Sequence, residues 1–216
     1  MHHKKGILFD MDGTLLDTLN DISASVNNAL KENGLKERTR DEVRSFLGNG
    51  AAYLMEKACD LPLDNEKVQR CLKRHISYYS ENDAVLTQPF EGVIDCLREL
   101  KEKGYLLGVV SNKEDSQVKD LSEKYFGDLM DLAIGRNDSL KKKPAGDMLE
   151  YAINQWNLAK EEVLYIGDMD IDLKTAENAG VECIIVLWGY ADYNKFNGNP
   201  VFIEKAEDLV KILEES

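Results

Sequence analysis

Residues 7–18 of the 216-residue chain read ILFDMDGTLLDT, an apolar run that ends in two acids, a glycine and a threonine. An apolar run of this length, bounded by turn-forming residues, is typical of a strand buried on both faces of a parallel sheet. In open parallel sheets, ligands bind beyond the carboxyl ends of the strands. The segment therefore predicts a buried strand that delivers Asp10 and Asp12 to a binding edge.

Further apolar runs along the chain extend this sheet. The expected strands are Ile7–Asp10, Tyr105–Ser111, Leu132–Gly135, Val163–Gly167, Cys183–Leu187 and, more weakly, Val201–Ile203. Helical patterns lie between them at residues 92–103, 115–125, 146–156, 170–179 and 206–214. Because strands that alternate with helices form parallel sheets with right-handed crossovers, the pattern predicts an α/β fold with a Rossmann-like parallel sheet core.

One connection is far longer than the others. The first and second strands are separated by about 94 residues, whereas a crossover needs only about a dozen. Its periodicity predicts helices at residues 18–32, 40–47, 50–59 and 65–81. We interpret residues 17–86 as an inserted α-helical cap domain, and residues 1–16 and 87–216 as the Rossmann-like catalytic core.

Two helix starts within the insertion carry recognisable signals. Thr39 and Glu42 have the spacing of a capping box, in which each side chain bonds the other residue's backbone N–H. Asp64 is expected to cap the longest of the helices.

Composition and charge exclude several classes of protein. The 40 Asp and Glu residues outweigh 27 Lys and Arg, so the net charge is −13, which argues against nucleic acid and anionic membrane surfaces as partners. No apolar run approaches the roughly 18 residues of a membrane helix, and the N-terminal run is too short for a signal peptide. The four scattered cysteines lack zinc-site spacing and are expected to be reduced. These features predict a cytoplasmic protein.

The expected strand ends carry residues of complementary chemistry. They are Asp10 and Asp12, then Ser111, Asn112 and Lys113, then Lys141, Lys142 and Lys143, and finally Asp168, Asp170 and Asp172. Since the carboxyl ends of parallel strands meet at one edge, these side chains are expected to converge.

This set of residues indicates phosphoryl transfer. A carboxylate can attack phosphorus and form an aspartyl-phosphate, but it is repelled by phosphate unless a cation lies between them. Mg²⁺ prefers carboxylate oxygens, which Asp10 and Asp168 can supply. Asp12 can protonate the leaving oxygen and later activate water. Ser111 and Asn112 can donate to phosphate oxygens, and a lysine can offset the charge.

Four segments in this order resemble the motifs of the haloacid dehalogenase superfamily. They are residues 10–18 (DMDGTLLDT), Ser111-Asn112-Lys113, Lys143-Pro144 and residues 167–172 (GDMDID). The helical insertion is similar to the superfamily's α-helical cap, and the resemblance covers essentially the whole chain. Gly48-Asn49-Gly50, Val110–Lys113 and Trp188–Tyr190 look like the phosphoglycolate phosphatase branch.

The resemblance implies a role for each matching residue. Asp10 would be the nucleophile and Asp12 the acid/base, while Ser111 and Asn112 would bind the substrate phosphate. Lys143 would stabilise the charged centre, and its place before Pro144 favours it over Lys141 and Lys142. Asp172 would support the metal directly or through water. The implied Mg²⁺ ligands are Asp10, Asp12 (through its backbone carbonyl), Asp168 and Asp172.

The resulting hypothesis is a Mg²⁺-dependent phosphatase of a small phosphorylated metabolite, with 2-phosphoglycolate favoured. A pyrophosphatase, nucleotidase or sugar-phosphate phosphatase of the same superfamily remains an alternative, as does a non-catalytic acidic binding module. Asp12 argues against a dehalogenase, which resembles this family but has no such acid/base. Ile22 replaces the histidine that β-phosphoglucomutase-like enzymes carry twelve residues after the nucleophile. Ser111 and Asn112 could instead cap a helix.

Overall fold

A computed structural model describes residues 4–82, 84–193, 196 and 200–214. The chain divides into two compact units, one of Met1–Leu16 with Pro89–Ser216 and one of Asp17–Gln88. The second unit extends two residues beyond the boundary drawn from the sequence. The reason is local: the backbone N–H and the hydroxyl of Thr87 both donate to the Asp21 carboxylate, each at 2.7 Å.

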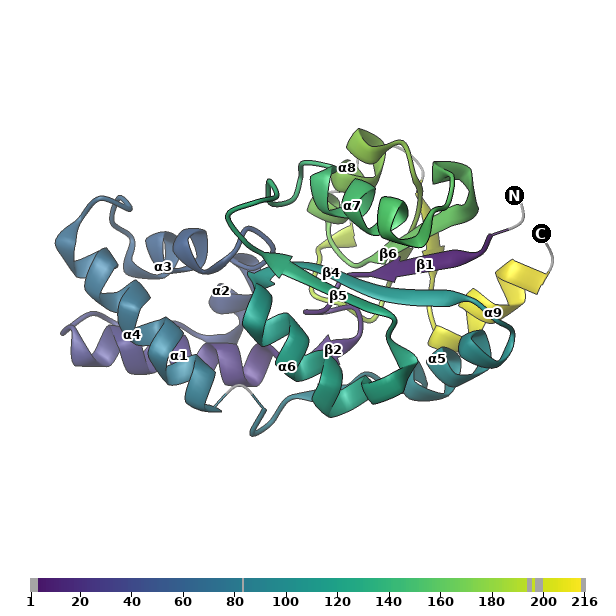
Figure 1. Ribbon diagram of the computed structural model, residues 1–216. Helices are drawn as coiled ribbons and strands as arrows, with labels where there is room; N and C mark the ends of the chain where they lie inside the picture. The colour runs from purple at the N-terminus through teal and green to yellow at the C-terminus, as the bar shows by residue number, and fades with distance from the viewer. Residues whose placement is uncertain (1–3, 83, 194–195, 197–199, 215–216) are drawn as a thin grey trace. The chain divides into compact units, whose positions relative to one another are not determined.

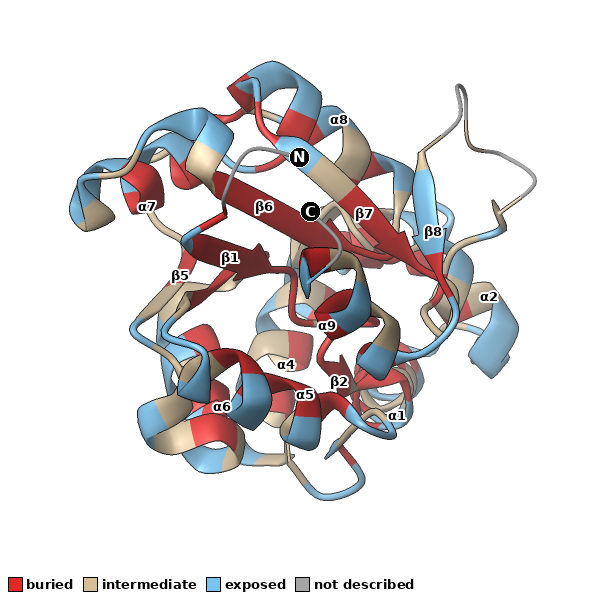
Figure 2. Cartoon of the chain, turned by 90° about the vertical axis from the view of Figure 1, so that its right-hand side faces the viewer, coloured by how far each residue is buried: buried red, intermediate tan, exposed pale blue. Residues whose placement is uncertain are grey.

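The larger unit is built on a parallel sheet that has six strands within the described residues, in the order β5-β4-β1-β6-β7-β8 (Figure 1). The strands are β1 (Gly6–Phe9), β4 (Leu106–Glu114), β5 (Leu132–Arg136), β6 (Val163–Gly167), β7 (Glu182–Val186) and β8 (Val201–Ile203). Every residue of β1 and β6 is buried, as Figure 2 shows in red. Burial on both faces explains why these strands are continuous apolar runs in the sequence.

Helices cover both faces of this sheet (Figures 1 and 2). One face carries α7 (Asp147–Trp156) and α8 (Asp170–Ala179), and the other carries α5 (Val93–Glu102), α6 (Asp115–Phe126) and α9 (Ala206–Glu214). Two short 3₁₀ turns, η1 (Gly127–Leu129) and η2 (Lys160–Glu162), precede β5 and β6. The α/β fold class predicted from the sequence is confirmed. In the part of the chain that the structure describes, no helix has the length and apolar character needed to cross a bilayer.

The smaller unit is helical. It contains α1 (Leu19–Glu32), α2 (Arg40–Ser45), α3 (Ala51–Cys59) and α4 (Glu66–Asn82). The helix α1 packs along α4 and buries residues at a spacing of three and four, including Ile22, Val26 and Ala29. This spacing places the buried side chains on one face of the helix, so that the opposite face meets solvent.

The two predicted helix starts have different outcomes. The capping box at α2 is confirmed, because Glu42 N–H donates to Thr39 Oγ1 at 3.2 Å and Thr39 N–H donates to Glu42 Oε2 at 2.7 Å. The cap predicted at Asp64 is wrong by one residue. The helix α4 begins at Glu66, and Asn65 Oδ1 accepts from Lys67 N–H at 2.9 Å. Asn is as good an N-cap as Asp, so propensity could not choose between them.

The chain leaves and re-enters the larger unit through two short strands, β2 (Leu16–Asp17) and β3 (Gln88–Pro89), which pair with each other. Neither has a sequence signal, because two residues are too few to show an alternation.

Candidate active site

The first two acids of the site come from neighbouring strands. Asp10 follows the last residue of β1, and its N–H donates to the carbonyl of Ile166 in β6 at 2.8 Å. Asp168 follows the last residue of β6. Because β1 and β6 run in parallel, both acids stand at the same edge of the sheet. Asp10 is only 6% exposed, and Asp168 is fully buried.

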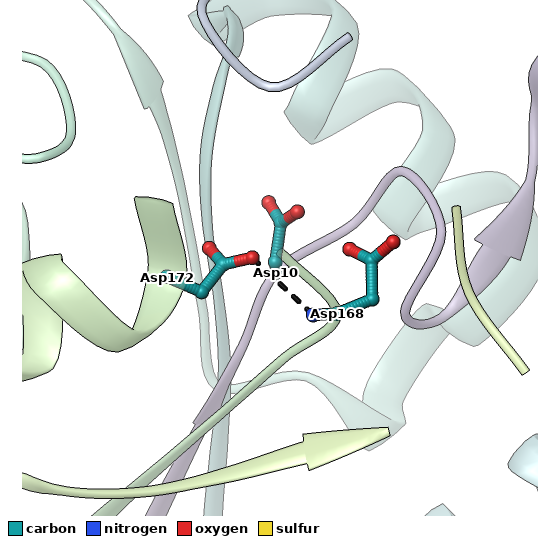
Figure 3. A group of neighbouring side chains, drawn as sticks. All are labelled: Asp10, Asp168 and Asp172. Atoms are coloured by element: carbon teal, nitrogen blue, oxygen red, sulfur yellow. Dashed lines mark hydrogen bonds between the residues drawn. The ribbon is translucent and has the colours of Figure 1, made fainter. Parts of the chain in front are cut away.

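Three buried carboxylates cluster at this edge. One oxygen each of Asp10, Asp168 and Asp172 lies within 4.8 Å of the others. Figure 3 shows the Asp10 and Asp168 carboxylates pointing to the same side, whereas Asp172 turns toward the backbone nitrogen of Asp168. Burial raises the pKa of Asp10 to about 7, although Lys143 opposes the shift. Burial, reinforced by the Asp172 charge, raises the pKa of Asp168 well above its usual range.

Lys143 is the cation within this cluster. Its Nζ lies 2.8 Å from Asp10 Oδ1 and 2.6 Å from Asp172 Oδ1, and its side chain is 2% exposed. Burial by itself lowers the pKa of this ammonium, but the two carboxylates outweigh burial and hold the pKa above its ordinary value. Of the three consecutive lysines, only Lys143 enters the cluster, since Lys141 and Lys142 are exposed.

Tyr165, which sequence reasoning missed, joins Lys143 to Asp172. Its hydroxyl donates to Asp172 Oδ1 at 2.9 Å and accepts from Lys143 Nζ at 3.1 Å. The other Asp172 oxygen accepts from the N–H groups of Asp168 and Met169 at the start of α8, at 3.3 and 3.0 Å. Asp172 is thus fastened on both oxygens, and it orients Lys143. In the sequence Tyr165 looks like an ordinary aromatic residue of a buried strand.

Asn112 holds the backbone of Lys143. Its Oδ1 accepts from Lys143 N–H at 2.8 Å, and its Nδ2 donates to the Lys143 carbonyl at 3.1 Å. Ser111 Oγ accepts from Lys113 N–H at 3.4 Å. Both residues are buried within β4, and the N-cap of α6 is Glu114, so neither caps that helix. The structure therefore gives the Asn112 side chain a positioning role that the sequence did not indicate.

Asp12 lies outside the carboxylate cluster and pairs with another lysine. Its Oδ2 is 3.2 Å from Lys113 Nζ, and its side chain is 20% exposed. The pair joins the segment after β1 to the end of β4, since these two strands are neighbours. Lys113 lies within the second motif segment, and the sequence predicts no role for it.

Two glycines make room for Asp168. A Cβ at Gly13 would stand 2.3 Å from Asp168 Oδ2, and a Cβ at Gly189 would stand 2.3 Å from Asp168 Cβ. Gly13 also has a φ of +90°, in the region that disfavours side chains. In the space so created, Asp168 accepts from Tyr190 N–H at 2.7 Å and from Thr14 Oγ1 at 3.3 Å. The packing around Asp168 therefore requires the glycine of residues 10–18.

A family model described as "Haloacid dehalogenase-like hydrolase" matches residues 7–186, most of the chain and all four motif segments. The chain belongs to this family. The membership inferred from the motifs is confirmed, and so is the predicted enzyme class: this haloacid dehalogenase-like hydrolase is a phosphatase, a phosphoric monoester hydrolase.

Relatives of this hydrolase match over nearly their full length. The chain is 34% identical to a phosphoglycolate phosphatase of Aquifex aeolicus over 96% of each chain. It is 28% identical to an N-acetylmuramic acid 6-phosphate phosphatase of Pseudomonas aeruginosa, covering 97% of this chain and 95% of the relative. A crystal structure from Lactobacillus delbrueckii, of a candidate phosphoglycolate phosphatase, superposes with a TM-score of 0.91 at 29% identity over 98% of both chains.

Proposed function

We propose that this hydrolase is a Mg²⁺-dependent phosphatase that cleaves a small phosphate monoester through an aspartyl-phosphate on Asp10. The observation that carries the proposal is the cluster of Asp10, Asp168 and Asp172 around Lys143. When all three carboxyls are ionised, the cluster holds three negative charges, and Lys143 offsets one of them. Buried charge of this kind is costly without a partner, and a divalent cation supplies the missing balance.

The donor set fits Mg²⁺. The ion prefers hard oxygen ligands, and the Asp10 and Asp168 carboxylates are buried and point the same way (Figure 3). Both oxygens of Asp172 already accept hydrogen bonds, which favours a supporting role through water. When bound, the cation would screen Asp10 from the substrate phosphate and favour the ionised carboxylates. The proposed ligands are Asp10, Asp12 (through its carbonyl), Asp168 and Asp172.

The proposed reaction has two displacement steps. In the first, an Asp10 oxygen bonds to phosphorus as the ester P–O bond breaks, and Asp12 gives its proton to the leaving oxygen, so that an alcohol departs. In the second, Asp12 takes a proton from a water molecule whose oxygen attacks phosphorus and displaces the Asp10 carboxylate. Inorganic phosphate leaves, and both acids return to their starting states.

Other residues would act on the transferring group. Lys143, which contacts Asp10, offsets negative charge on the nucleophile and the phosphoryl oxygens. The Ser111 hydroxyl would donate to a phosphate oxygen. Asn112 would act on the phosphate indirectly, by positioning Lys143. Its carboxamide bonds both the N–H and the carbonyl of the Lys143 backbone.

We favour 2-phosphoglycolate as the substrate, because the similar proteins of Aquifex aeolicus and Pasteurella multocida are named as phosphoglycolate phosphatases. A sugar phosphate is the second candidate, since the similar Pseudomonas aeruginosa protein is named for one. We assign catalysis to the larger unit and substrate selection to the helical unit. A cytoplasmic location is supported by the four cysteines, all of which are free thiols.

The nucleophile is tested by Asp10→Asn. With Mg²⁺ present, this variant should release no phosphate above background, because an amide oxygen is too weak a nucleophile to form the intermediate. Asp170→Asn is the matched control: it removes an exposed acid from the last motif and should keep wild-type turnover. Appreciable turnover by a folded Asp10→Asn protein would overturn the mechanism.

The substrate is tested by a phosphate-release panel. We expect 2-phosphoglycolate to exceed sugar phosphates, nucleotides and pyrophosphate in kcat/KM, and we expect a chelator to stop every reaction. If pyrophosphate or a nucleotide gave the highest kcat/KM, it would replace 2-phosphoglycolate as the favoured substrate. Phosphate release that continues unchanged in the presence of chelator would contradict the dependence on Mg²⁺.

A further inference from the structure

Trp188, in the turn that follows β7, reaches across the edge of the sheet to the turn that follows β1. Its indole Nε1 donates to the backbone carbonyl of Thr14 at 2.9 Å. Because β6 lies between β1 and β7 in the sheet, this contact passes over the end of β6, where Asp168 begins the next segment. Thr14 is only 1% exposed, and a buried carbonyl needs a donor. Trp188 therefore fixes the backbone of Thr14.

Thr14 in turn holds Asp168. Its Oγ1 donates to Asp168 Oδ1 at 3.3 Å, while Tyr190 N–H donates to Asp168 Oδ2 at 2.7 Å. The carboxylate is held on both oxygens, so it cannot rotate without breaking one of these hydrogen bonds. Since each carboxylate oxygen can accept more than one hydrogen bond, both oxygens keep the capacity to bind a cation.

A second buried carboxylate of the chain shows what a purely structural arrangement looks like. Asp21 accepts from the N–H of Leu86 and from the N–H and hydroxyl of Thr87, at 2.7 to 3.1 Å. Asp168 is buried more deeply, yet its hydroxyl donor stands farther away, at 3.3 Å. Its carboxylate points to the same side as that of Asp10 (Figure 3). The contacts of Asp168 therefore set its direction and leave acceptor capacity toward Asp10.

We infer that Trp188 is a positioning residue of the metal site, which acts through Thr14 to fix the direction of the Asp168 carboxylate. The inference rests on the proposed function, in which Asp168 is a ligand of Mg²⁺. This ion demands nearly ideal octahedral geometry, whereas Ca²⁺ accepts a more flexible arrangement. Hydrogen-bond partners that orient a ligand typically change metal affinity by about tenfold to a hundredfold when they are removed.

The first test removes the hydroxyl and keeps the shape of the side chain. In Thr14→Val the Kd for Mg²⁺, measured by calorimetry on the substrate-free protein, should rise by about tenfold. The Kd for Ca²⁺ should rise by less, about threefold, because Ca²⁺ tolerates a looser carboxylate. Thr14→Ser keeps the hydroxyl and should restore the wild-type affinities.

Thr175→Val is the matched control for Thr14→Val. Thr175 is fully buried in the same unit, and its hydroxyl donates to the carbonyl of Ile171 in its own helix at 2.6 Å. Its removal should leave the Kd for Mg²⁺ unchanged. Thermal melts of the metal-free proteins would separate a loss of stability from a loss of affinity.

The second test addresses Trp188 itself and applies even where Thr14→Val does not fold. Trp188→Phe keeps an aromatic ring and removes the N–H group, so the Kd for Mg²⁺ should rise by about threefold to tenfold. If Trp188 acts through the Thr14 hydroxyl, Trp188→Phe should add little to the loss already present in Thr14→Val.

Three results would overturn the inference while the phosphatase stands. They are a lower melting temperature with unchanged Mg²⁺ affinity in Trp188→Phe, which would make the contact purely structural; equal losses of Mg²⁺ and Ca²⁺ affinity in Thr14→Val; and fully additive losses in the double variant. A wild-type protein that binds no Mg²⁺ would instead overturn the metal dependence in the proposed function.

Discussion

The two compact units bury polar groups in opposite ways. In the helical unit the buried Asp21 and Ser25 side chains meet neutral partners. The Asp21 carboxylate accepts from the N–H of Leu86 and from the N–H and hydroxyl of Thr87, at 2.7 to 3.1 Å. The Ser25 hydroxyl donates to the His75 carbonyl at 3.0 Å and lies 2.8 Å from its Nδ1. These contacts fasten one segment to another.

The larger unit gathers like charges instead. Its buried Asp10, Asp168 and Asp172 crowd together, and burial and mutual repulsion raise the pKa of Asp10 and Asp168. Crowding of this kind is unfavourable for folding and is typical of a functional site. Buried polarity alone therefore does not mark a functional site. Unbalanced buried charge does, and it occurs here at the edge of the sheet.

The largest effect among the residues that support the acids should follow removal of Lys143, an ammonium inside the cluster. Lys143→Met should lower kcat for phosphate release by about a thousandfold, because it removes a preorganised charge from the transferring group. Lys141→Met and Lys142→Met are matched controls from the same run of lysines, and both side chains are exposed. Thermal melts of all three proteins would separate lost chemistry from lost folding. A comparable loss of kcat in either control would contradict the assignment of Lys143 as the lysine that acts on the transferring group.

In the helical unit, removal of a buried polar side chain should lower stability. Asp21→Ala would leave the N–H groups of Leu86 and Thr87 without their acceptor, and Asp21 is only 4% exposed. We expect the free energy of unfolding to fall by about 3 kcal/mol. Urea denaturation measures the loss, and Asp21→Asn, which keeps one acceptor oxygen, should lose less. An unchanged urea midpoint in Asp21→Ala would show that this buried carboxylate does not stabilise the helical unit.

Mg²⁺ should stabilise the larger unit through the unbalanced cluster. If the ion binds only the folded chain, it should add about 2.7 kcal/mol when its free concentration is about 100 times Kd. Thermal shifts with Mg²⁺ and with chelator would measure the gain. Asp168→Asn should abolish the shift, and Asp170→Asn should keep it. A shift that survives Asp168→Asn would place the ion elsewhere.

Much of this organisation was predictable from the sequence, because long elements carry periodic signals. The strand Val163–Gly167 has the bounds that its apolar run predicts, and the carboxylates follow strand ends where parallel pairing brings them together. The strands β2 and β3 could not be predicted, because two residues show no period. Asp64 and Asn65 are equally good caps, so propensity could not fix the start of α4, where Asn65 Oδ1 accepts from Lys67 N–H.

Contacts between distant residues account for the rest. The Tyr165 hydroxyl has a role only because Lys143 and Asp172 lie around it, and these are 22 and 7 residues away in the chain. Asn112 Oδ1 accepts a hydrogen bond from the backbone N–H of Lys143, which is 31 residues away in the chain. No local pattern encodes such partners. The motif residues themselves were identifiable, but the residues that hold them in place were not.

The smallest effect belongs to a local contact, the capping box of α2. Thr39→Ala should lower the free energy of unfolding by about 1 kcal/mol, since one N-terminal N–H loses its acceptor. The reciprocal bond adds a dependence on pH. The Thr39 backbone N–H, which donates to Glu42, lowers the pKa of that carboxyl below its ordinary 4.5.

A folded-state pKa below the unfolded value means stability that is present above pH 4.5 and lost as pH falls through the lowered pKa. Glu42→Gln should therefore be less stable than wild type at pH 7 and equally stable once the acid is protonated in both states. Urea midpoints across this range measure the difference. A gap that persists in acid would assign the contribution to packing and not to charge. That outcome would sharpen the contrast between the two units, because the helical unit would then draw no stability from ionised groups at this cap.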